Sequence, residues 1–343
     1  MELFQQTHLN ERQETILRIV IESFIETNRP VGSSYISSNY PLSLSSATIR
    51  SCLASLEKTG LLTNLHISSG RIPTDAGYRY YVDKLLTSDN SSRRLEPAIY
   101  NQLKEMSDNI ENLMQATAIT LAKVCQMFGI VVISGVNDSV ITEIEAFSLS
   151  SDRVMIVIAL RSGLVKSIAL NLHIDVVPTD IEELNITLKE RIVGFTLKEI
   201  QNTIRGRLSN TPIFDHEIVQ IILNQADSIF KIAEETLIYT SSYNELLNYP
   251  EFQDIKILKR TITGLQENNI REYLIPPTDS ENINTIIGHE NKIDNLQHCS
   301  VLSSSFLGAT YSGRLAVLGP TRVPYKQVKS LLKYFVEMLP NVY

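Results

Sequence analysis

The chain has 343 residues, enough for about two domains of ~150 residues each. Hydrophobic residues make up 43% and charged residues 20%, a composition that is typical of a folded globular protein and excludes a disordered or fibrous chain. The 31 basic and 38 acidic residues give a formal net charge of −7, which at first argues against nucleic acid as a partner.

The cysteines and the hydropathy pattern indicate a cellular compartment. Cys52, Cys125 and Cys299 lie far apart without a CxxC pair, so neither a zinc ribbon nor a disulfide framework is predicted. Sparse cysteines suit a reducing environment. The start of the chain lacks the pattern of a signal peptide, and no run of ~18 apolar residues occurs. We therefore expect a cytoplasmic protein that does not associate with membranes.

Residues 1–87 have the order of elements of a winged helix-turn-helix domain. Asn10, with Gln13 three residues later, is typical of a helix start, and apolar residues recur at helical spacing up to about residue 27. A short helix should follow at 33–39, and a second helix between Ser45 and Gly60. A strand at 61–67, a turn at 68–70 and a returning strand at 71–73 should then form a hairpin, and a final helix should begin at Thr74.

The helix that follows Ser45 is the predicted DNA-reading element. Ile49, Leu53 and Leu56 form one apolar stripe, which leaves small and polar side chains for the opposite face. Small residues allow close approach to base edges in the major groove, and Arg50 could bond to a guanine or a phosphate. The alternative is a packed helix with a polar exterior, in a module that contacts protein.

The hairpin tip adds groups suited to phosphates. Gly70 supplies the turn, and Arg71 could follow a phosphate or enter a minor groove, although a solvated turn with an incidental arginine is the alternative. Residues 1–87 contain eight basic and eight acidic residues, so the acidic excess lies outside them. The predicted DNA-binding residues are Ser33, Ser45, Ala47, Thr48, Arg50, Ser51, Ser55, His66, Ser69, Gly70, Arg71 and Arg79.

The rest of the chain predicts a sheet in two pieces with helices between them, as in an α/β domain that carries an insertion. A polar linker occupies 87–94. Helices are expected over 97–128, 180–192, 214–247 and 325–339, and strands over 130–136, 141–149, 153–160, 165–172, 298–306 and 314–318.

The block at 202–275 is predicted to join two copies of the chain. One winged helix with about four or five phosphate contacts would bind weakly and with steep salt dependence. A second copy raises the affinity through effective concentration. The alternative is that the apolar residues of this block pack on the sheet of their own chain. The predicted dimerisation residues are Ile218, Ile221, Ile222, Ile229 and Phe230.

Motifs of enzymes are incomplete. The segment 308–315 has the glycine spacing of a phosphate-binding loop but lacks its lysine and its Ser/Thr. His216–Glu217 and His289–Glu290 do not continue as HExxH, and no GxSxG occurs. We expect no enzyme activity, no catalytic residue, no cofactor and no bound metal.

Several segments closely resemble the family of heat-inducible transcription repressors, HrcA, over nearly the whole chain. The segments that carry the resemblance are PVGS at 30–33, ATIR at 47–50, SGRIPTD at 69–75, GYRYYV at 77–82, IGHEN at 287–291 and GPTR at 319–322. Ser34, Ser46 and Ser51–Cys52 depart from the family's usual residues, which affects the expected affinity for DNA.

The resemblance implies an α+β multidomain fold. It implies a winged helix at 1–87, a linker with the start of a long helix at 88–104, a GAF-like domain from 105–201 and 276–343, and a helical dimerising domain inserted at 202–275. It also implies a homodimer that represses chaperone operons by binding the CIRCE inverted repeat in double-stranded DNA. A GroEL-type chaperonin would keep this repressor competent, and heat would release it.

Two other functions remain open on the sequence. The chain could be a ligand-sensing regulator with a small-molecule effector in the GAF-like domain, or a scaffold whose winged helix binds protein. A CIRCE repeat upstream of chaperone genes would favour the repressor, and a thermal shift with one metabolite would favour the sensor. Failure of an intact dimer to bind DNA at low salt would favour the scaffold.

Overall fold

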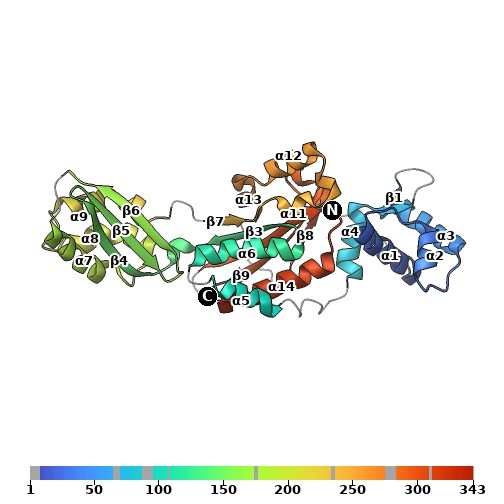
Figure 1. Cartoon of the computed structure of the whole chain (residues 1–343), viewed down its shortest axis with the longest axis horizontal. Coiled ribbons are helices and arrows are strands. Elements are labelled where there is room, and N and C mark those ends of the chain that lie inside the picture. Colours follow the sequence, from blue (N-terminus) through green and yellow to red (C-terminus); the bar gives the residue numbers. More distant parts are fainter. Residues whose placement is uncertain are drawn as a thin grey trace.

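The computed structural model arranges the chain as three bodies in a row (Figure 1). The N-terminal domain lies at one end, a central domain built on a five-stranded sheet follows, and an inserted domain with a three-stranded sheet lies at the far end (Figure 1). All sheets are antiparallel, so the fold is of the mixed α+β kind. The structure describes residues 8–64, 70–86, 96–106, 109–173, 177–232, 236–274, 283–308 and 311–342.

The N-terminal domain follows the predicted order. Its elements are α1 (Glu11–Thr27), α2 (Ser33–Asn39), α3 (Ser46–Lys58), β1 (Leu62–Asn64), β2 (Arg71–Pro73), α4 (Asp75–Tyr80) and the π-helical turn η1 (Tyr81–Leu85). The predicted start of α1 is confirmed. The Asn10 side chain accepts the backbone N–H of Gln13, and the Gln13 side chain accepts that of Asn10, each at 3.0 Å. Three helices followed by a two-stranded hairpin is the order of elements expected of a winged helix-turn-helix.

Apolar faces of α1 and α3 form the core of this domain. Ile16 and Val20 of α1 and Ile49 and Leu56 of α3 are fully buried, and Leu53 is nearly so, which confirms the predicted inward stripe of α3. The opposite face of α3 is therefore left to solvent.

The central domain has the strand order β7-β3-β10-β9-β8. Its strands are β3 (Phe128–Ser134), β7 (Thr236–Thr240), β8 (Asn284–Ile287), β9 (Cys299–Leu307) and β10 (Ser312–Pro320). Its helices are α5 (Glu96–Lys104), α6 (Ile110–Cys125), α11 (Asn244–Leu247), α12 (Ile255–Gly264), α13 (Glu267–Leu274) and α14 (Tyr325–Val342). Short 3-10 turns are η4 (Pro250–Phe252), η5 (Gly288–Glu290) and η6 (Asp294–Leu296).

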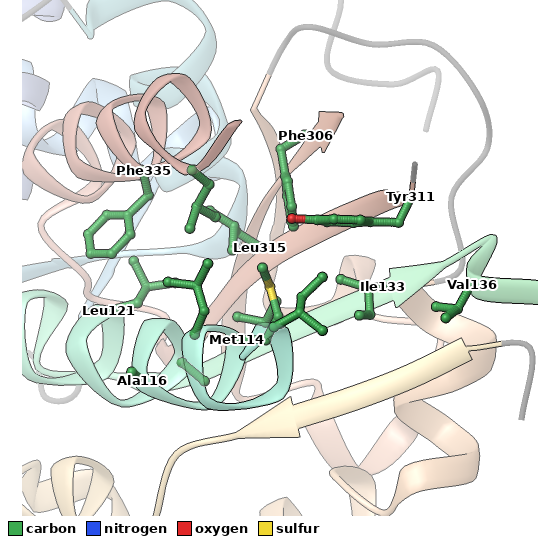
Figure 2. Close-up of a cluster of buried hydrophobic side chains, with 14 of the residues drawn as sticks. Met114, Ala116, Leu121, Ile133, Val136, Phe306, Tyr311, Leu315 and Phe335 are labelled. Atoms are coloured by element: carbon green, nitrogen blue, oxygen red, sulfur yellow. The ribbon is translucent and has the colours of Figure 1, made fainter. Parts of the chain in front are cut away.

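Helices cover both faces of the central sheet (Figure 1). Helices α6 and α14 pack on one face, where Met114, Leu121, Leu315 and Phe335 meet in one apolar cluster (Figure 2). The segment that contains α11 to α13 packs on the other face, where Phe128, Ile130 and Leu318 belong to a second buried cluster. The sheet is thus buried on both sides, which explains its long apolar strands.

The inserted domain has the strand order β4-β5-β6. It consists of η3 (Val136–Asp138), β4 (Ile141–Ser150), β5 (Arg153–Leu160), β6 (Val165–Asn171), α7 (Pro178–Ile192), α8 (Leu197–Leu208), α9 (Glu217–Asn224) and α10 (Ala226–Ile229). Helix α7 lies along β4, where the Asn185 side chain bonds to both the N–H and the C=O of Ala146, at 2.7 and 3.0 Å. This contact satisfies backbone groups that an open strand edge would expose.

The predicted boundaries of the insertion are wrong. Ser134 of β3 pairs with Thr236 of β7, so the chain leaves and re-enters the central sheet at adjacent positions. The strands of 141–172 form their own sheet instead of continuing the central one, while residues 236–274 belong to the central domain. The insertion therefore lies between β3 and β7 rather than at 202–275, and it contains strands as well as helices.

Two predicted helices are also wrong in extent. The helix expected over 97–128 is two helices, because Asn109 caps the start of α6 by accepting the backbone N–H groups of Glu111 and Asn112. The helical run expected over 214–247 is interrupted by β7, whose sequence TLIYT is rich in β-branched and aromatic residues. The strand forms because β3 offers it a partner across the base of the insertion.

Candidate nucleic-acid interface

Helix α3 presents the predicted reading face. The Ser45 side chain caps its start by accepting the backbone N–H of Thr48 at 3.1 Å. Ser46, Ala47, Arg50 and Ser51 are exposed, on the side opposite the buried stripe. These residues occupy the first two turns of the helix, the part that enters the major groove in a helix-turn-helix.

Serine and threonine hydroxyls border this face. Ser33, half-buried at the start of α2, accepts a hydrogen bond from the Ser46 hydroxyl at 3.4 Å. The half-buried Thr48 lies beside Ser45, with 2.9 Å between the two hydroxyl oxygens. The hydroxyls at the starts of α2 and α3 thus form one small polar cluster.

Ser55 was predicted to share the reading face, and the structure places it elsewhere. Its hydroxyl accepts a hydrogen bond from the Gln13 side chain of α1 at 2.9 Å. Ser55 lies four residues after Ser51, which rotates it by roughly 40° around the helix axis. That rotation turns the side chain toward α1 and away from the exposed face.

The hairpin is anchored at the loop end of its strands, where Arg71 pairs with Asn64. Arg71 pairs with Val31 of the α1–α2 loop through two backbone hydrogen bonds of 2.9 and 2.8 Å. The Arg71 guanidinium forms an ion pair with Glu57 of α3, at 2.8 Å between Nη2 and Oε2. The side chain therefore lies against α3 instead of at the hairpin tip. His66 and Ser69 lie outside the described residues.

Gly70 has no room for a side chain beside this anchor. A Cβ there would lie 2.6 Å from the carbonyl carbon of Val31. We expect Gly70→Ala to lower the free energy of unfolding by about 1–3 kcal/mol, because the hairpin must shift away from the loop. Gly32→Ala is the matched control, since its Cβ meets nothing within 4 Å. Denaturant unfolding of both variants checks this, and equal losses would contradict it.

Arg79 was predicted to contact DNA, but it joins the N-terminal and central domains. Its guanidinium forms an ion pair with Glu290 and donates to the carbonyl oxygen of Thr285 at 2.6 Å. It also pairs with Asp83 on its own helix at 3.2 Å. Two carboxylates and a carbonyl already occupy the donors of this guanidinium, so Arg79 is not placed to bind a DNA phosphate.

Asp75 makes a second contact between the same two segments. Its Oδ2 accepts the backbone N–H of His289 at 3.0 Å and lies 2.7 Å from the His289 ring Nδ1. Gly288 has a φ of +54°, and a Cβ there would overlap the Asp75 carboxylate. The motifs at 69–82 and 287–291 therefore meet at one interdomain contact. Their complementary charges were visible in the sequence, but their pairing was not.

Arg322 also bridges these domains. Its side chain is 11% exposed and bonds to Glu251, at 3.1 Å between Nη2 and Oε2. Its Nη1 donates to the carbonyl oxygen of Ile25 in the last turns of α1, at 3.3 Å. This arginine ties η4 of the central domain to the first helix of the N-terminal domain.

The predicted dimerisation residues lie inside the inserted domain. Ile222, Ile229 and Phe230 are fully buried, Ile218 is 5% exposed and Ile221 is half-buried. Four of the five lie in the core of their own domain and cannot contact a second copy without unfolding it, while Ile221 keeps part of its surface exposed. The residues pack within their own chain, as the alternative had it, but in the inserted domain and not on the central sheet.

The buried cysteines have structural rather than reactive positions. Burial raises the pKa of the Cys125 and Cys299 thiols to about 12, which keeps them protonated, and Cys52 is half-buried on α3. Across the residues that the structure describes, no cluster of His, Cys, Asp or Glu has the composition of a metal site. None of the described helices combines the length and the apolarity that crossing a bilayer requires.

Comparisons with known proteins agree on one family. A family model described as "HrcA protein C terminal domain" matches residues 111–328. The heat-inducible transcription repressor HrcA of Chlorobium phaeobacteroides (strain BS1) is 31% identical over 348 residues, which cover 97% of this chain and 98% of the relative. That of Halalkalibacterium halodurans is 27% identical over 340 residues, which cover 98% and 99%.

A solved structure supports the arrangement of the domains. A crystal structure described as that of a hypothetical protein matches with a TM-score of 0.70 at 21% identity and covers 98% of each chain, which shows a shared fold. The sequence matches extend over both the N-terminal and the C-terminal parts. The chain therefore belongs to the HrcA family of heat-inducible transcription repressors.

Proposed function

We propose that this chain represses chaperone operons by binding the CIRCE inverted repeat as a homodimer, with α3 in the major groove. The exposed start of α3 is the observation that carries the proposal. A methyl group at Ala47, hydroxyls at Ser46 and Ser51 and the guanidinium of Arg50 are groups that contact base edges and phosphates. The family consists of transcription repressors, not enzymes, which agrees with this use of the helix.

The proposed interface is smaller than the predicted one. Ser55 and Arg79 leave it because each is engaged within the protein. Arg71 stays at its border because it lies at the loop end of the hairpin beside Gly70, whereas Arg79 lies at the contact with the central domain. His66 and Ser69 stay in the proposal on the sequence alone. The interface keeps Ser33, Ser45, Ala47, Thr48, Arg50, Ser51, Gly70 and Arg71 as its described members.

Fluorescence anisotropy across a salt series tests this function. The full chain should prefer a duplex with the CIRCE inverted repeat over a scrambled duplex, and its affinity should fall steeply with salt. Arg71→Ala should weaken both duplexes and reduce the log–log slope by about one unit, as expected for a phosphate contact. Equal affinity of the wild type for the two duplexes would refute the proposal.

The outer face of the inserted sheet is the surface that we propose for dimerisation. Val154, Ile156 and Ile158 of β5 point to the core and are fully buried. On the opposite face, Phe147 of β4 is 43% exposed and Val165 of β6 is 51% exposed. Because Asn185 covers the edge of β4, association should use this apolar face rather than the strand edge.

A charge on this face should separate the two copies. We expect Phe147→Glu to weaken the dimer at least about tenfold, because a carboxylate would replace buried apolar contact in both copies. Ile186→Glu is the control, since Ile186 is 55% exposed on α7, outside this face. Sedimentation velocity over a concentration series measures both. A Phe147→Glu variant that dimerises like the wild type would rule out this surface.

The same proposal includes a cytoplasmic location and a GroEL-type chaperonin as modulator. Its support is the family membership together with the word "heat-inducible" in the relatives' name. The N-terminal domain meets the central domain through polar contacts and the buried ring pair of Tyr78 and Tyr325, and a repressor with such a contact can lose its geometry by partial opening. A chaperonin would then restore the competent form.

A further inference from the structure

A buried arginine lies on the face of the central sheet that α11 to α13 cover. Arg314 of β10 is 6% exposed. Its direct neighbours in the sheet are Val132 of β3 and Ser305 of β9. Two residues further along β10, Ala316 belongs to the apolar cluster of this face. Side chains two apart on a strand share a face, so the guanidinium extends along that same side.

Among the residues that the structure describes, the charge of Arg314 has no counter-ion. Its Nη2 donates to the Ser305 hydroxyl at 3.2 Å, while its Nε is buried without an acceptor. Among the described residues, no carboxylate forms an ion pair with it. Burial lowers the pKa of this guanidinium. A buried cation without a partner is costly, and native proteins rarely retain one without a reason.

Arg322 shows how this fold otherwise treats a buried arginine. The Arg322 side chain is 11% exposed and is paired with the carboxylate of Glu251. Arg314 is more deeply buried and has a single neutral hydroxyl in the corresponding place. The missing partner of Arg314 is therefore an anion.

Further hydroxyl groups lie on the same face of the sheet. Ser312 shares the face of Arg314, and the register places Ser134 opposite Ser312 and Thr236 opposite Ser134. In the part of the chain that the structure describes, these three hydroxyls form no hydrogen bond to another protein group. Arg271 of α13 donates to the carbonyl oxygen of Thr236 at 2.9 Å, so α13 lies over this end of the sheet. Ser305, which Arg314 contacts, and Ser312, two residues from Arg314 along β10, are the hydroxyls placed to share an anion with the guanidinium. Ser134 and Thr236 lie one and two strands away on the other side of β10.

We propose that the central domain binds a small molecule through a carboxylate or phosphate group at Arg314, with Ser305 and Ser312 as hydroxyl partners. The ligand's anionic group would pair with the guanidinium in two hydrogen bonds. This site is independent of the DNA interface, so the proposal does not depend on operator binding. It gives the central domain a sensing function in addition to its role as a connector between α3 and the dimer.

Thermal unfolding of the full chain tests the site, with inorganic phosphate and citrate as probes against chloride at equal ionic strength. We expect either probe to raise the Tm of the wild type by about 3 °C or more at saturation. Phosphate also stabilises many proteins non-specifically, so the variants decide the outcome. Arg314→Met should abolish the shift, and in chloride it should unfold no earlier than the wild type. Arg161→Met, at an exposed arginine of the inserted domain, should keep the shift.

A second variant keeps the test decisive if Arg314→Met fails to fold. Ser305→Ala removes the hydroxyl to which the Arg314 guanidinium donates. It should raise the phosphate or citrate concentration at half-maximal shift about tenfold. A response to phosphate alone would identify a phosphate-bearing ligand, and a response to citrate alone a carboxylate. An absent shift in the wild type, or an equal shift in Arg314→Met or Ser305→Ala, would overturn the proposal.

Discussion

Charge reversal at Arg50 should weaken binding to the inverted repeat by more than about 30-fold. Arg50 is exposed on the second turn of α3, beside Ala47 and Ser51. One side-chain contact to a base edge is worth about 1–3 kcal/mol, and a dimer loses it twice. Two such losses amount to at least about 2 kcal/mol, which corresponds to a roughly 30-fold weaker affinity. Anisotropy with the labelled repeat at fixed salt measures it.

The control must change the net charge equally without touching the interface. Lys333→Glu does so, because Lys333 is 73% exposed on α14 of the central domain. We expect its affinity for the repeat to stay within about twofold of the wild type at moderate salt, where distant surface charges are screened. If Arg50→Glu and Lys333→Glu weakened binding to the same degree, only overall charge would matter and α3 would not be the reading element.

Removing the partner of Arg322 should produce the largest loss of stability. Glu251→Ala leaves a guanidinium that is only 11% exposed without its carboxylate. Breaking a buried ion pair in this way costs about 3–5 kcal/mol. We expect about 3 kcal/mol, because Arg322 keeps its hydrogen bond to Ile25 and its contact with the ring of Tyr249. Denaturant unfolding measures the change.

An exposed ion pair is the matched comparison. Glu337 pairs with Lys333 on α14 at 3.8 Å, and both side chains are more than half exposed. Glu337→Ala should lower the free energy of unfolding by less than about 0.5 kcal/mol, since surface pairs are screened by water. A loss in Glu251→Ala as small as that in Glu337→Ala would show that Arg322 is not a structural link between the domains.

The N-terminal domain was predictable because its signals are local. The Asn10–Gln13 capping box, the Ser45 cap and the stripe at 49, 53 and 56 each act within one or two helical turns. Such signals depend on the backbone of their own helix and need no distant partner. The exposed face of α3 follows from them, and with it the members of the interface that the structure retains.

The remaining features depend on contacts between distant segments. Strand β7 forms because Thr236 meets Ser134, across the whole inserted domain. Arg79 and Ser55 look like free polar residues in the sequence, but Glu290 and Gln13 bind them in the fold. The buried state of Arg314 likewise requires the sheet register, because an isolated arginine in a strand gives no sign of whether helices cover it.

The net charge of the whole chain also differs from that of its N-terminal segment. The whole chain carries −7, yet its first 87 residues have equal numbers of basic and acidic groups. Two of the basic groups in that segment, Arg71 and Arg79, are in addition paired with Glu57 and Glu290. A nearly neutral winged helix cannot hold DNA by charge alone, so its affinity must depend on base contacts and on two copies acting together.

The most direct test of the repressor account compares the complete inverted repeat with a duplex that contains one half-site. Titration of the full chain should give two chains per complete repeat, and an affinity at least about 100-fold higher than for the half-site, because the second contact is intramolecular. One chain per duplex with equal affinity for the two DNA molecules would contradict the account.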